Sequence, residues 1–136
     1  MKTYALQLKT GQDLKDELKK FTDVHHIKAG YILTAVGNLT KATLRFVDEE
    51  IKTFNENFGI VSMDGTLSPD GMHVHIAISD KNGITFGGHL KEGCIVYHSA
   101  EIVIGESENF TFSRKFDSKT GFNELQIQPL GETAKA

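Results

Sequence analysis

Three histidines, His73, His75 and His89, are the residues of this sequence whose types and spacing best suit chemistry. Side chains alternate between the two faces of a β-strand, so a strand over residues 71–79 puts His73 and His75 on one face. Apolar side chains occupy the other face, which is therefore the core side. A turn at residues 81–83 predicts a returning strand that carries His89, and two glycines just before His89 leave room beside its ring.

Three neutral imidazoles on a cleared face are typical of a metal site with an open coordination position. Zn²⁺ is the first expectation, with water as the fourth ligand, although imidazole also suits nickel, copper and cobalt. A zinc-bound water titrates near pH ~7, and the ion can polarise a carbonyl group or supply a nucleophile. A His-x-His pair also arises by chance, so strand histidines hydrogen-bonded to neighbours or water remain the alternative.

Glu101 is the candidate catalytic residue, because a carboxylate within the apolar segment 100–104 is uncommon. It would act as a general base or as a partner that orients a metal ligand. An outward-facing glutamate on an edge strand is the competing interpretation. His98 falls on the opposite face of a regular strand from Glu101 and is left out of the site unless a bulge intervenes. Arg45 is expected to be a surface ion-pair partner.

The composition indicates one globular domain over residues 1–130, with 131–136 as a frayed tail. The chain has no apolar segment long enough to span a membrane and no signal-like N-terminus. A single cysteine, Cys94, excludes an internal disulfide and fits a reducing compartment, so we expect a cytoplasmic protein. The 15 basic residues are outnumbered by 18 acidic ones, which disfavours unaided binding to nucleic acid.

The elements that position these residues are mainly strands. One amphipathic helix is expected, with Thr10 as its N-cap and apolar residues Leu14, Leu18 and Phe21 on one stripe, ending near Val24. Short strands separated by Gly, Asn and Asp turns predict an α+β fold with a mainly antiparallel sheet. The expected strands cover residues 4–8, 31–36 (ending at Gly37-Asn38), 43–47, 51–54, 60–67, 71–79, 84–90, 95–104, 110–116 and 125–128, with an exposed turn at 117–121.

Several ordered motifs give the chain a family resemblance from about Tyr4 to Phe112. It resembles the plants-and-prokaryotes conserved (PPC) domain family, stand-alone bacterial or archaeal type, whose fold is similar to that of acetolactate decarboxylase. The motifs that carry the likeness lie at residues 30–39, 63–68, 70–80, 83–94 and 100–104.

The resemblance implies a small α+β domain that forms a homotrimer. Acetolactate decarboxylase is a zinc enzyme with a similar His-x-His…His set, which supports a metal at His73, His75 and His89. In plants the domain is joined to AT-hook DNA-binding motifs, and bacterial members are often labelled DNA-binding. This chain contains no Arg-Gly-Arg-Pro-type hook, and it departs from the family pattern at Gln7 and at His98-Ser99.

Three functions therefore remain open. The first is a homotrimer with a three-histidine metal site that binds or converts a small carbonyl or carboxylate ligand. The second is a DNA-binding or transcription-associated protein in which the domain serves oligomerisation and partner binding. The third is a metal-binding or structural trimer without catalysis. The sequence does not decide whether the protein is an enzyme.

Overall fold

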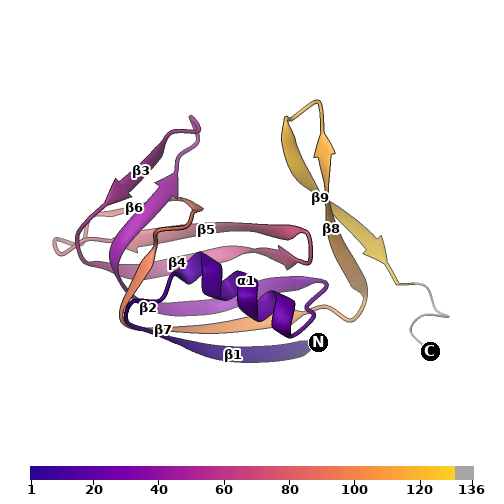
Figure 1. Cartoon of the computed structure of the whole chain (residues 1–136), viewed down its shortest axis with the longest axis horizontal. Coiled ribbons are helices and arrows are strands. Elements are labelled where there is room, and N and C mark those ends of the chain that lie inside the picture. The colour runs from indigo at the N-terminus through magenta and orange to yellow at the C-terminus, as the bar shows by residue number, and fades with distance from the viewer. Residues whose placement is uncertain (131–136) are drawn as a thin grey trace.

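The computed structural model describes residues 1–130, so the tail predicted at 131–136 lies outside the described residues. Figure 1 shows a curved sheet, one helix and a separate hairpin that projects from the sheet. The prediction of an α+β fold with a mainly antiparallel sheet is confirmed. The elements are β1 (Lys2–Lys9), α1 (Leu14–Val24), β2 (Gly30–Arg45), β3 (Ile51–Phe54), β4 (Phe58–Ser68), β5 (Gly71–Ser79), β6 (Thr85–Leu90), β7 (Ile95–Glu106), β8 (Phe110–Asp117) and β9 (Phe122–Pro129).

The main sheet has the strand order β1-β7-β2-β4-β5-β6, and all of its pairings are antiparallel. The end of β2 also pairs with β6, through Leu44 with Leu90 and Arg45 with His89. The strands β2, β4, β5 and β6 therefore form a closed ring of paired strands at one end of the sheet. This closure brings the end of β2 beside the strand that carries His89.

Helix α1 packs its apolar stripe into the core of the sheet, where Leu14 and Leu18 are fully buried. The expected N-cap at Thr10 is wrong, because Thr10 lies in the preceding turn and Asp13 caps the helix. One carboxylate oxygen of Asp13 accepts a hydrogen bond from the backbone N–H of Asp16 at 3.1 Å. The other accepts one from the N–H of Gly93 at 2.7 Å, so Asp13 also fixes a distant loop. Of the described residues, none form a helix long and apolar enough to cross a membrane.

The strand break expected at Gly37-Asn38 is also wrong, because β2 continues for 16 residues through that point. The pairing of β2 with β7 shifts in register at Gly37-Asn38, which accommodates the irregular backbone there without ending the strand. A Cβ atom on Gly37 would lie 2.4 Å from the carbonyl oxygen of Ser99, so glycine permits the close approach of the two strands. On the β7 side the shift leaves His98 with a positive φ of 62°.

The hairpin of β8 and β9 is anchored to the body near its base. The N–H of Phe112 donates to the carbonyl of Lys28 at 2.9 Å, and the N–H of Arg114 donates to the carboxylate of Asp70 at 3.0 Å. The turn predicted at 117–121 joins the two strands and is exposed apart from partly buried Asp117. The hairpin thus stands beside the β4–β5 turn, with its position fixed by few contacts.

Candidate metal centre

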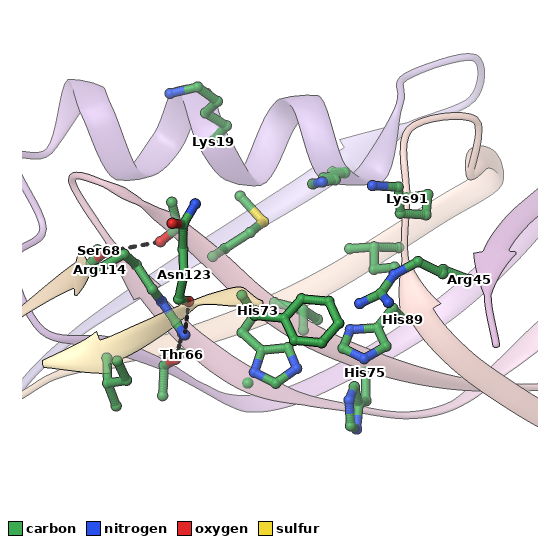
Figure 2. A pocket seen from close by; sticks show the side chains of 18 of the residues that line it. Lys19, Arg45, Thr66, Ser68, His73, His75, His89, Lys91, Arg114 and Asn123 are labelled. Carbon is green, nitrogen blue, oxygen red and sulfur yellow. Dashed lines mark hydrogen bonds between the residues drawn. The ribbon is translucent and has the colours of Figure 1, made fainter. Parts of the chain in front are cut away.

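The structure brings His73, His75 and His89 together, as their spacing predicted. His75 and His89 are directly opposite each other on β5 and β6, and His73 lies on the same face of β5. The ring centroids are 4.5 Å apart for His75 and His89, 4.7 Å for His73 and His89, and 5.1 Å for His73 and His75. Each ring offers a nitrogen within 4.8 Å of the others. Figure 2 shows the three rings facing one another in the cavity.

This separation fits a metal ion. In tetrahedral coordination with Zn–N distances of about 2.0–2.1 Å, ligand nitrogens lie about 3.4 Å apart. Side-chain rotations of the half-exposed or exposed rings are enough to close the remaining gap. The carboxylate of Asp64, opposite His75 on the neighbouring strand, provides a partner that can orient a ligating imidazole.

The glycines before His89 have a different structural reason from the one expected. A Cβ on Gly87 would lie 2.4 Å from the carbonyl oxygen of Ile76, and one on Gly88 would lie 2.8 Å from the carbonyl oxygen of Arg45. Both glycines therefore permit close backbone approach between β6 and its two neighbouring strands. They place His89 within reach of His73 and His75, and both glycines also line a hollow beside these rings.

The environment favours the neutral form of two of the imidazoles, those of His73 and His89. Burial, together with the nearby Arg45 guanidinium, lowers the pKa of His89 to about 4. Burial also lowers the pKa of His73, followed by the repulsion from His75 and Arg114. Because only the neutral imidazole has a lone pair for a metal, these shifts favour metal binding at neutral pH.

The histidines line an open cleft of about 1230 Å³, bordered by α1, the end of β2 and the loop after it, the β4–β5 hairpin, β6 and the β8–β9 hairpin. A second hollow of about 560 Å³ lies over Ala77 and Gly87 and shares His75 and His89 with the first. Two of the imidazoles, those of His75 and His89, therefore border both hollows.

Arg45 belongs to this site, although it was expected on the surface. It is directly opposite His89 across the β2–β6 pair, and only 21% of its side chain is exposed. Glu49 is its one ion-pair partner among the described residues, at 4.0 Å, and the guanidinium lies 5.4 Å from the centre of the Phe122 ring. The pairing of β2 with β6, which joins segments far apart in the chain, is what turns Arg45 toward the histidines.

Asp64 is a further residue that the sequence interpretation missed. It pairs with His75 across β4 and β5, so the carboxylate and the imidazole project from the same face. The tight turn between Ser68 and Gly71 sets this register. Counting back equally on both strands from that turn matches Thr66 with His73 and Asp64 with His75, a signal that was present in the sequence.

The family model of the Plants and Prokaryotes Conserved (PCC) domain matches residues 1–108, a range that contains all three histidines. The chain belongs to this family. The resemblance stated from the motifs is thereby confirmed, and the strands that hold the histidines are part of the PCC domain. Hairpin β8–β9 begins beyond the matched range.

Two curated relatives of this PCC domain are bifunctional GlmU proteins from Synechococcus strains. The protein of strain JA-3-3Ab is 44% identical over 97% of this chain, and that of strain JA-2-3B'a(2-13) is 44% identical over 96%. The matches cover 21% of each of these proteins, so the chain spans about a fifth of the length of its curated relatives.

Solved structures share the fold. A hypothetical protein from Salmonella cholerae-suis is 36% identical with a TM-score of 0.90, over 94% of both chains. A metal-containing protein from Archaeoglobus fulgidus is 27% identical with a TM-score of 0.77, over 93% of this chain and 94% of its own. A protein from Staphylococcus aureus described as similar to alpha-acetolactate decarboxylase matches with a TM-score of 0.50 at 13% identity, over 79% and 52%, which bears out the expected likeness in fold alone.

Glu101, the predicted catalytic residue, is not brought to the histidines within one chain. It is exposed on β7, opposite Gln7 of β1 and Val36 of β2. Strands β2 and β4 lie between β7 and β5, and Glu101 lines neither hollow. His98 sits in the irregular part of β7, where the bulge removes the regular alternation used to place it, and it also lines neither hollow.

Proposed function

We propose that this PCC-domain protein binds one divalent transition-metal ion through His73, His75 and His89, with zinc as the first candidate. The observation that carries the proposal is the set of three imidazole nitrogens within 4.8 Å at the edge of a cleft. The lowered pKa values of His73 and His89 support it, because both rings are neutral at pH 7. The relative from Archaeoglobus fulgidus, described as metal-containing, is consistent with it.

A zinc ion at this position would act as a Lewis acid with an open coordination site, suited to a small carbonyl or carboxylate ligand. The protein's own contribution is to hold the three rings and to exclude part of the solvent by the walls of the cleft. Asp64, opposite His75, has the position needed to orient that ring or to accept a proton from a ligand. Glu101 has no such position within a single chain.

The proposal includes a homotrimer and a cytoplasmic location, which rest on the family resemblance and on the single cysteine. Analytical ultracentrifugation tests the first. A monomer at all concentrations would contradict it. Fractionation of cells that express the native gene tests the second.

Metal analysis tests the metal site directly. The protein is purified without chelator or histidine tag, alongside His73→Ala/His75→Ala and the control His25→Ala, which removes an exposed histidine near the end of α1. We expect about one ion per chain in the wild type and the control, and loss of the ion in the double variant. Wild-type protein that is metal-free and takes up no added Zn²⁺ would contradict the proposal.

A DNA-associated role is the second candidate. Candidate DNA-binding proteins from Bacteroides thetaiotaomicron (24% identical, TM-score 0.83, 91% of both chains) and Ralstonia eutropha (22%, 0.80, 90% of both) share the fold. At these sequence identities the similarity shows a shared fold and no shared function. The net charge of −3 on this chain opposes binding to the phosphate backbone of DNA. Duplex binding that weakens steeply with salt would favour this role, and no binding at low salt would remove it.

A further inference from the structure

The guanidinium of Arg114, on hairpin strand β8, is partly buried without a negative partner. Its Nη2 donates to the hydroxyl of Thr66 at 2.8 Å, and its Nη1 donates to the carbonyl oxygen of Asn123 at 3.3 Å. Its Nε is completely buried and has no hydrogen-bond partner. Among residues 1–130, no carboxylate oxygen lies within 4.0 Å of this guanidinium. The Glu124 carboxylate acts on this guanidinium only from beyond that distance, so the loss of hydration is not fully compensated, which points to a missing anion.

Arg114 is also placed beside the histidines. Thr66, which it holds, pairs directly with His73 across β4 and β5. Arg114 and the three imidazoles line the same cleft. Figure 2 shows Arg114 and Arg45 on opposite sides of the three rings, with Arg114 toward His73 and Arg45 toward His89.

Arg45 adds a second, partly buried positive charge. Its side chain is 21% exposed, and its contact with the exposed Glu49 is at the 4.0 Å limit of an ion pair. The carboxylates of Asp64 and Glu124 also line the cleft, but neither lies within 4.0 Å of either guanidinium. A divalent ion bound by three neutral imidazoles would add two more positive charges between the two arginines.

We propose that the ligand of the three-histidine centre is a small carboxylate, a 2-oxo acid by class, whose carboxylate is bound by Arg114 while its oxo group faces the metal. Arg45 stabilises the same negative charge from the other side of the rings. Planar guanidinium groups suit carboxylates because two parallel N–H donors match the two oxygens. This inference rests on the proposed metal site and adds the chemical class of its ligand and the residue that selects it.

The test compares charged and uncharged ligands of the same shape. Zinc-loaded protein is titrated by calorimetry with pyruvate and 2-oxobutanoate, and with the methyl esters of both, which keep the oxo group and lack the negative charge. We expect the acids to bind at least about tenfold more tightly than the esters, because a hydrogen-bonded charge pair is lost in the ester. Equal binding of acids and esters, or no binding of either acid, would overturn the inference.

Two variants identify the residue. Arg114→Met keeps the apolar stem and removes the charge, and we expect it to weaken binding of the acids by about 10- to 100-fold while zinc content is unchanged. Arg114→Lys should recover part of the affinity. Lys115→Met is the matched control, because it removes an exposed charge from the adjacent residue, and it should bind like the wild type. Unchanged affinity in Arg114→Met would assign the selectivity elsewhere and contradict the inference.

Zinc analysis of the same samples separates the two proposals. A wild-type protein without zinc after loading contradicts the metal site, and the ligand inference fails with it. A zinc-loaded protein that does not distinguish acid from ester contradicts the ligand inference alone. If Arg114→Met does not fold, the comparison of acid with ester on the wild type still tests the class of ligand, and Arg114→Lys tests the residue.

Discussion

Gly87→Ala tests whether the close approach of β6 to β5 builds the metal centre. The added Cβ would lie 2.4 Å from the carbonyl oxygen of Ile76 and 3.1 Å from Cα of Ala77, both backbone atoms that cannot rotate away. Separating the strands to ordinary contact requires a shift of about 1 Å, and overpacking of this kind costs about 1–3 kcal/mol. The shift also moves His89, which is two residues further along β6.

The expected loss is measurable. Unfolding entropies of about 2.1 cal/mol/K per residue give this chain of 136 residues a fall in Tm of about 3–4 °C for each kcal/mol, so Gly87→Ala should melt about 4–10 °C lower. The melts are made with chelator present, which separates folding from metal binding. Zinc affinity, measured by competition with a chromophoric chelator, should fall by at least about tenfold, because ligand geometry is disturbed as well.

Gly59→Ala is the matched control, because its added Cβ would meet only the side chain of Asn38 at 4.0 Å. That variant should melt within about 2 °C of the wild type, since exposed or open substitutions usually change stability by less than about 0.5 kcal/mol. If Gly87→Ala and Gly59→Ala have equal Tm values and equal zinc affinities, the argument from strand approach is refuted.

Other predictions address the helix end, the carboxylates and pH. His26 follows the C-cap of α1 with a φ of 52°, and its N–H donates to the carbonyl of Asp23. Glycine adopts this left-handed conformation without strain, so His26→Gly should raise the free energy of unfolding, measured in urea, by about 1 kcal/mol. A decrease would contradict the assigned left-handed cap. Asp64→Asn should weaken zinc binding about 10-fold or more, as expected for a residue that orients a metal ligand, while Glu101→Gln should leave zinc affinity unchanged. A loss of zinc affinity in Glu101→Gln but not in Asp64→Asn would restore Glu101 to the site. The pKa values of His73 and His89 are lowered in the folded protein, so the unfolded chain binds protons first as pH falls. Metal-free protein should therefore lose stability progressively from about pH 6.5 down to the His89 pKa of about 4, and His89→Gln should flatten this profile in thermal melts at each pH.

Local signals were sufficient to predict much of the site. The alternation of polar and apolar residues in 71–79 placed His73 and His75 on the outer face, and the burial of Val74, Ile76 and Ile78 agrees with it. The turn at 81–83 then returned the chain with His89 in register. These are contacts between neighbours in sequence, where strand period and turn length determine the geometry.

Contacts between distant segments were not predictable in the same way. Arg45 reaches His89 because the end of β2 pairs with β6, and no local pattern around Arg45 indicates that partner. The apolar neighbours of Glu101 suggested a special carboxylate, but Ile102 and Ile104 belong to the core face while Glu101 itself is exposed. Asp13 rather than Thr10 caps the helix, and its second oxygen accepts a hydrogen bond from Gly93, in a loop that sequence spacing does not bring near.

The position of Arg114 on the hairpin has a consequence for how such proteins diversify. The three histidines and Arg45 belong to the matched PCC domain, whereas Arg114 lies beyond residue 108 on a hairpin that forms its own two-stranded sheet. Few hydrogen bonds tie that sheet to the body, so its residues can change without disturbing the strands that hold the imidazoles. On the proposed function, the PCC domain would hold the metal ion while a separate hairpin would select its ligand, so a change of ligand would require changes in the hairpin alone.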